Sequence, residues 1–184
     1  SVEIFDPQTG QWAMGPALPG VVWSATAINV GGKILLVGGY DGSQNLNQVL
    51  ELDPANNQWI QKASMPQAHN GLKLVLFKGK VWAIGGNWTG IYDVASDSWT
   101  TGPSLNTNRE WSTAWVSNGR IYAAGGRLNG STHLNSTEVY DSVTNQWIAA
   151  GNLPENKFCA DTLVLDGKVY LVAGQRGSSD YSNK

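Results

Sequence analysis

The chain has 184 residues, enough for a single domain with a substantial core. Only 14% of the residues are charged, whereas 22 are glycine and nine are tryptophan, which is typical of a loop-rich all-β protein and excludes a disordered chain or a coiled coil. The formal net charge of −2 gives no indication of nucleic acid or membrane as a partner, and no apolar run approaches the roughly 20 residues of a membrane span.

Two sequence markers recur along the chain with matching spacings. The first is a glycine pair with spacings of 47, 40 and 49 residues, found at Gly38, Gly85, Gly125 and, in a decayed copy, Gly174. The second is a tryptophan with spacings of 47, 40 and 48 residues, found at Trp12, Trp59, Trp99 and Trp147. Both spacings contract in the same interval, so the two markers belong to one repeated unit.

Each unit predicts four short strands in a fixed order. In one copy, residues 72–77 form a first strand, and a Lys-Gly-Lys turn joins it to a second strand over residues 81–84. The glycine pair follows, then a third strand ending in a Tyr-Asp-type pair, then a turn and a fourth strand led by the tryptophan. Side chains alternate with period 2 and no stretch has helical periodicity. Four-stranded units with this period are typical of β-propeller blades.

The glycine pair, the Tyr-Asp-type pair and the tryptophan six residues later resemble the kelch repeat over essentially the whole chain. The fourth copy departs from the pattern, since it has Ala173-Gly174-Gln175 in place of the glycine pair. The expected fold is therefore an all-β, kelch-type propeller over residues 1–184. Its four blades are expected at about residues 20–65, 66–104, 105–153, and 154–184 together with 1–19.

The two ends of the sequence match different halves of one repeat. Residues 169–173 correspond to a second strand and residues 2–5 to a third, and from Gly174 around to Gly38 is 48 residues, one period. We therefore predict four blades in a monomer, one of them completed by strands from both termini, which pairs the exposed edges. There are two alternatives. One is a homodimer in which two strand-exchanged chains form an eight-bladed ring, and the other is a portion of a larger propeller.

Candidate binding residues lie in the connections that enter the first strand or follow the glycine pair. Both connections are expected on one rim, and loops on a rigid frame concentrate binding residues. Kelch domains similar to this one bind ligands there, often through an arginine at the position of Arg109. The candidates are Trp23, Tyr40, His69, Asn70, Trp88, Arg109, Glu110, Trp111, Arg127, Lys157, Phe158 and Arg176, with Asp180 and Tyr181 in the last loop.

We expect a non-catalytic binding module that holds a peptide or protein segment, or a carbohydrate, on this rim. Three tryptophans in the loops exceed what solubility requires, so Trp23, Trp88 and Trp111 would supply exposed stacking surface. Four cationic residues would bind carboxylate, phosphate or sugar hydroxyls, namely Arg109, Arg127, Lys157 and Arg176. His69 and Asn70 would add directional hydrogen bonds.

Two further classes of function remain as alternatives. A sugar-acid epimerase or mutarotase would use Arg109 and Glu110 as acid–base residues. A structural unit would only pair its split blade with another chain. The sequence has no HExxH, GxSxG or paired Cys/His set, so neither a metal site nor a cofactor is expected. Residues 1–20 lack signal-peptide character, and the single cysteine, Cys159, is expected to be a buried, inert thiol that indicates no compartment.

Overall fold

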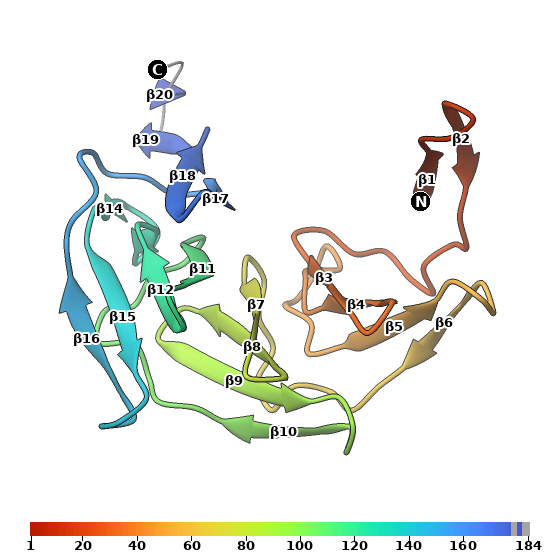
Figure 1. Cartoon of the computed structure of the whole chain (residues 1–184), viewed down its shortest axis with the longest axis horizontal. Helices are drawn as coiled ribbons and strands as arrows, with labels where there is room; N and C mark the ends of the chain where they lie inside the picture. Colours follow the sequence, from red (N-terminus) through yellow and green to blue (C-terminus); the bar gives the residue numbers. More distant parts are fainter. Residues whose placement is uncertain (178–179, 182–184) are drawn as a thin grey trace. The chain divides into compact units, whose positions relative to one another are not determined.

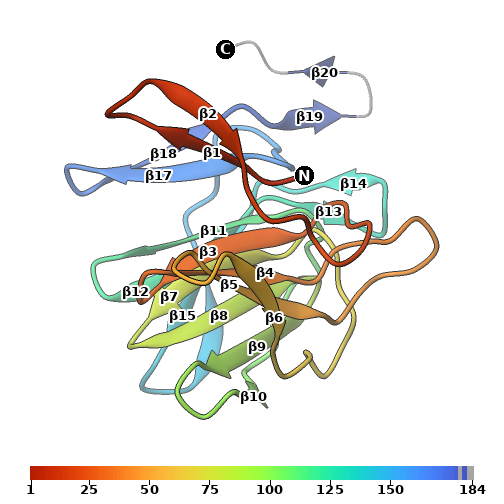
Figure 2. The same ribbon diagram turned by 90° about the vertical axis from the view of Figure 1, so that its right-hand side faces the viewer.

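The computed structural model describes residues 1–177 and 180–181, and the regular elements found there are all β-strands. Among these residues, no helix has the length and apolar character needed to cross a membrane. The chain divides into two compact units, Ser1–Asn70 and Gly71–Lys184, which are taken in turn. Figures 1 and 2 show the strands of both units from two directions.

The first unit contains a hairpin and one complete blade. The hairpin pairs β1 (Glu3–Asp6) with β2 (Gln11–Met14). The blade is a four-stranded antiparallel sheet with the strands in chain order, β3 (Thr26–Val30), β4 (Lys33–Val37), β5 (Val49–Asp53) and β6 (Gln58–Gln61). Leu35 and Val37 of β4 are buried together with most of β5, so the core of this blade lies on its middle strands.

The second unit contains two complete blades and three short hairpins. The strands of the first blade are β7 (Lys73–Phe77), β8 (Lys80–Gly85), β9 (Trp88–Asp93) and β10 (Ser98–Thr101). Those of the second blade are β11 (Thr113–Ser117), β12 (Arg120–Ala124), β15 (Thr137–Asp141) and β16 (Gln146–Ala150). The hairpins, seen in Figure 2, are β13 (Arg127–Leu128) with β14 (Thr132–His133), β17 (Asp161–Leu165) with β18 (Lys168–Val172), and β19 (Gln175–Gly177) with β20 (Asp180–Tyr181).

The blades of the second unit pack through their first strands, because β11 lies beside both β7 and β17. One apolar cluster joins the two complete blades, and the ring of Trp82 lies 4.8 Å from that of Tyr140. The prediction of an all-β fold of kelch-type propeller blades is confirmed: the three complete blades are antiparallel sheets in the predicted strand order. The two incomplete parts, β1–β2 and β17–β18, are separate two-stranded sheets. Their union into one blade, and a single domain over residues 1–184, stay predictions.

The contraction of the repeat to 40 residues has a simple cause in the second unit. Strand β8 ends at Gly85, β9 begins at Trp88, and these two residues pair directly, so the strands form a tight hairpin. The other complete blades have long loops at this point, residues 38–48 and 125–136. The missing loop shortens the repeat and draws Trp88 into a strand.

The first glycine of the pair allows a close approach by the next connection. At Gly125, φ is +63° and an added Cβ would overlap the carbonyl oxygen of Lys157. The same oxygen accepts a 2.7 Å hydrogen bond from the N–H of Gly126. The glycine pair therefore fixes the connection that enters the next blade.

Gly125→Ala is expected to lower the free energy of unfolding by about 2–4 kcal/mol, because left-handed strain adds to the overlap with Lys157. Gly130→Ala is the matched control, since φ is +73° there and an added Cβ meets no heavy atom within 4 Å. In the control, only the left-handed strain is expected to lower the free energy of unfolding, by about 1–2 kcal/mol. Urea unfolding followed by tryptophan fluorescence measures both, and equal losses would show that the contact with Lys157 contributes nothing.

Candidate functional site

Loops of the second unit bring several predicted residues together. Glu110 and Arg127 form an antiparallel bridge through backbone N–H···O bonds of 2.9 and 2.7 Å, and Phe158 forms another bridge with Gln175. The guanidinium of Arg127 lies over the ring of Phe158, 5.6 Å from its centroid, and that ring stacks on His133 at 4.7 Å. Two aromatic rings and a cation are therefore held against one another by paired backbones.

A cavity of about 340 Å³, here called the rim pocket, opens beside this cluster. Its lining residues are Arg127, Gly130, Ser131, His133, Phe158 and Gln175. Arg127 has 30% of its side chain exposed and lies 3.8 Å from the carboxylate of Glu110, yet its Nε is buried and has no hydrogen-bond partner among the described residues. The pocket thus combines a partly satisfied guanidinium with an aromatic wall.

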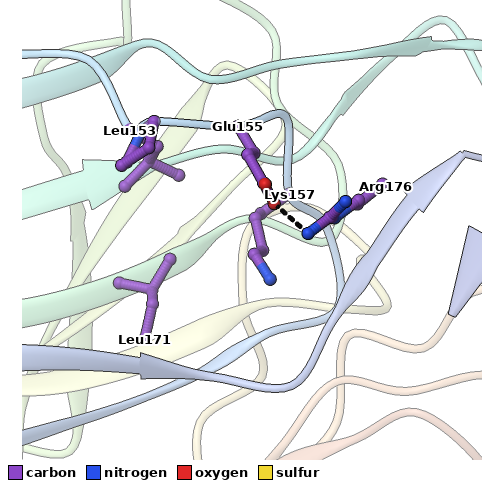
Figure 3. A pocket seen from close by; sticks show the side chains of 6 residues that line it. Leu153, Glu155, Lys157, Leu171 and Arg176 are labelled. Atoms are coloured by element: carbon purple, nitrogen blue, oxygen red, sulfur yellow. Dashed lines mark ion pairs between the residues drawn. The ribbon is translucent and has the colours of Figure 1, made fainter. Parts of the chain in front are cut away.

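Lys157 and Arg176 belong to a different cavity, here called the edge pocket. Its volume is about 290 Å³ and its lining residues are Leu153, Pro154, Glu155, Lys157, Leu171 and Arg176. Figure 3 shows Arg176 paired with Glu155, at 2.6 Å. Lys157 donates from Nζ to the carbonyl of Ala173 at 3.3 Å. Both cations are thus already engaged, and the structure places them apart from the rim pocket.

Arg109 is a structural residue, which corrects the prediction that it binds a ligand. Its side chain is 0% exposed, and Nη2 lies 2.8 Å from Oε1 of Glu138. The other donors reach the same carboxylate, the carbonyls of Gly125 and Ser136, and the Ser136 hydroxyl, at 2.8–3.2 Å. All five N–H donors of the guanidinium are therefore satisfied inside the blade.

The predicted acid–base pair of Arg109 and Glu110 is not assembled in the structure. Glu110 has 43% of its side chain exposed and its ion pair is with Arg127, whereas Arg109 is paired with Glu138. The two residues are adjacent in the chain and their side chains point to opposite sides of the backbone. A ligand that touched Glu110 would therefore not meet Arg109.

Trp88 is buried, so the prediction that it supplies exposed surface is wrong. Its side chain is 5% exposed, its ring lies 6.2 Å from that of Trp99, and it covers Gly90, where an added Cβ would collide with it. Trp111 is half-buried against Gly71. The direct β8–β9 hairpin explains the burial of Trp88, because a strand residue packs on its sheet where a loop residue would have faced solvent.

The remaining candidates lie in the first unit. Trp23 is 60% exposed, as predicted, and its ring lies 6.1 Å from that of Tyr40, to which its backbone is also paired. Asn70 donates to Oδ1 of Asn45 at 2.9 Å. His69 is half-buried, and burial lowers the pKa of its ring, which favours the neutral form at pH 7.

Sequence reasoning missed His133, Gln175 and Ser131 in the rim pocket. The segment that holds His133 forms the β13–β14 hairpin, which turns His133 onto Phe158. Cys159 is exposed, which corrects the prediction of a buried thiol. The side chains of Asp180 and Tyr181 lie outside the described part of the structure.

Comparison with known proteins agrees with this architecture. The sequence matches the Kelch motif over residues 24–66 and 113–154. It is 31% identical to Kelch-like protein 35 of Mus musculus over 131 residues, which are 69% of this chain and 23% of that protein. It is 27% identical over 135 residues to Kelch repeat protein M-T8 of Myxoma virus (strain Lausanne), covering 68% and 26% of the two chains. Over 144 residues it is 32% identical to the Kelch-like protein terF of Aspergillus terreus, covering 65% and 31%.

The chain thus spans between about a quarter and a third of the length of these relatives. The matched residues include the complete blades β3–β6 and β11–β16, which carry the glycine pairs and the phased tryptophans. Sequence markers, strand order and relatives lead to the same assignment. The chain belongs to the kelch-repeat family.

Proposed function

We propose that the chain is a protein-binding module and that its rim pocket holds an acidic side chain of an extended peptide segment. The observation that carries this proposal is the guanidinium of Arg127, which lies over Phe158, has 30% of its side chain exposed and reaches Glu110 only at 3.8 Å. An incoming carboxylate would pair with the exposed part of this guanidinium at the 2.7–2.9 Å of a charge-assisted hydrogen bond.

The pocket suits a carboxylate better than a neutral ligand. Nη2 of Arg127 is 3.8 Å from Glu110, longer than the 2.7–2.9 Å of a charge-assisted hydrogen bond, so the guanidinium has room to form one with a ligand. Ser131 and Gln175 also line the pocket and carry donors and acceptors for a peptide backbone. His133 is half-buried and stacks on the buried ring of Phe158, so its ring offers an apolar surface beside the charge.

A peptide is preferred to a carbohydrate because the pocket combines one cation with one aromatic wall, and a peptide with an acidic residue beside an apolar one matches both. The enzyme alternative has no support in the geometry, since Arg109 and Glu110 do not face a common cavity.

The test uses random peptides displayed on phage and selected against the full chain, followed by calorimetry with the synthetic peptides. We expect selected peptides to share an Asp or Glu next to an apolar residue, and Arg127→Gln to weaken their binding about 10- to 100-fold. Arg120→Gln is the matched control, because Arg120 is an exposed arginine at the β11–β12 turn, and it is expected to change nothing. Selected peptides without acidic residues, or equal binding by Arg127→Gln and wild type, would contradict the proposal.

A further inference from the structure

A cavity of about 320 Å³, here called the interblade pocket, opens between the two complete blades of the second unit. Phe77 and Trp82 of one blade line it together with Tyr140 of the other, and the ring of Phe77 lies edge-on to both of the other rings. Ile91, which is half-buried, adds aliphatic surface to the same wall. These side chains hold one another in place, so this wall of the pocket is apolar and preformed.

Lys78 lines the interblade pocket from a backbone conformation that lysine rarely adopts. In each repeat a two-residue turn joins the first strand to the second, and both turn residues have positive φ. The first turn residue of the other repeats is Gly31, Asn118 or Asp166, and these residue types tolerate this conformation. At Lys78 φ is 49°, which is strained for a long side chain. Strained residues cluster at ligand sites, so the strain points to a role for the Lys78 side chain.

Two hydroxyl-bearing residues of the interblade pocket, Thr100 and Ser142, also differ from their equivalents in the repeat. The other complete blades have apolar side chains at both positions, with Ile60 and Ile148 in place of Thr100, and Pro54 and Val94 in place of Ser142. The blade therefore folds with apolar residues at these positions. Three polar departures from the repeat, at residues 78, 100 and 142, thus gather on one cavity.

The ammonium of Lys78 is the uncompensated charge of the interblade pocket. Its Nζ lies 5.3 Å from the ring centroid of Phe77, and within the described part of the chain Lys78 makes no ion pair. Lys80, by contrast, is paired with Asp93 at 3.1 Å. The nearby carboxylate of Asp141 accepts hydrogen bonds from the N–H and hydroxyl groups of its own turn. The pocket therefore offers one positive charge beside an apolar wall.

We propose that the interblade pocket binds a small carboxylate that carries an apolar ring. The carboxylate pairs with the ammonium of Lys78, and the ring packs on Ile91 and the aromatic wall. The hydroxyls of Thr100 and Ser142 supply further donors for the carboxylate. A cavity of about 320 Å³ is at the lower end of ligand pockets, which suits a ligand of the size of phenylacetate. This pocket shares no lining residue with the rim pocket, so the proposal is independent of peptide binding there.

The test is a ligand-observed NMR titration of the full chain with phenylacetate and with its neutral isostere, phenylacetamide. We expect phenylacetate to bind, and phenylacetamide to bind about 10-fold more weakly because it has no charge to pair with Lys78. Lys78→Asn is expected to weaken the binding of phenylacetate about 10-fold and to leave that of phenylacetamide unchanged. The variant should also have a higher urea midpoint than the wild type, because asparagine tolerates the turn conformation, as Asn118 does.

Lys168→Asn is the matched control, because Lys168 is an exposed lysine at the start of β18 and does not line the interblade pocket. It is expected to bind phenylacetate as the wild type does. No binding of phenylacetate by the wild type, or equal affinities for the two probes, would overturn the proposal. Undiminished binding of phenylacetate by Lys78→Asn would overturn it as well, and that is the result expected if the probe occupied the rim pocket. A lower urea midpoint for Lys78→Asn would contradict the argument from strain.

Discussion

Arg109→Met is expected to lower the free energy of unfolding by about 3–5 kcal/mol, because it leaves the carboxylate of Glu138 buried without its counter-ion. The guanidinium also bonds to the carbonyls of Gly125 and Ser136, which lose their donors in the variant. Glu138 keeps the backbone N–H groups of Asn106 and Thr107, at 2.7 and 3.1 Å. These two bonds do not neutralise a buried charge, so most of the loss remains.

The double variant Arg109→Met/Glu138→Leu separates the ion pair from the packing. Replacing a buried pair by apolar residues of similar volume is often neutral or stabilising, so the double variant is expected to recover most of the loss. Blade β3–β6 already has apolar residues at these two positions, with Val22 in place of Arg109 and Leu50 in place of Glu138. Urea unfolding measures all three proteins, and a loss below about 1 kcal/mol in Arg109→Met would show that the pair does not hold the blade together.

Trp147→Ala is expected to lower the free energy of unfolding by about 3–5 kcal/mol, since it removes a large buried side chain and leaves a cavity. Urea unfolding measures this loss. Trp147 is 2% exposed and belongs to the cluster that joins the two complete blades of the second unit. Its Nε1 also donates to the carbonyl of Pro103, in the connection between those blades. The variant therefore loosens the contact between blades as well as one sheet.

Trp147→Phe is the matched variant, because it keeps an aromatic ring but cannot donate to Pro103. Its free energy of unfolding is expected to be about 1–2 kcal/mol below that of the wild type, because the hydrogen bond is missing and the ring is smaller. If Trp147→Ala were no worse than Trp147→Phe, the tryptophan would act through its hydrogen bond alone and the packing argument would fail.

Repeat spacing predicted the blades because each marker acts on its own local backbone. Both glycines of the pairs at Gly38 and Gly125 take positive φ where the next connection approaches, and alternating apolar residues favour strands that bury one face. Local rules of this kind need no knowledge of distant residues.

The repeat spacing did not predict which residues of the rim are buried, because burial there depends on neighbours in space that are distant in the sequence. Aligning the repeats placed Arg109 at a binding position, but its partner, Glu138, lies 29 residues further along the chain. One signal was present in the sequence: the complete blade with a cation at this position also has a glutamate directly before its Val-Tyr-Asp. Reading the two positions as a pair would have identified a structural contact.

The sequence by itself determined the strand order, the register of the repeats and the family, because these follow from backbone geometry and the alternation of side chains. The tertiary structure alone decided which loop residues are buried and which line a cavity. Burial of Trp88 followed from one missing loop, and the rim pocket followed from a hairpin that turns His133 onto Phe158. A side chain's exposure is set by the neighbouring segments that fold over it, and a repeat pattern does not encode those segments.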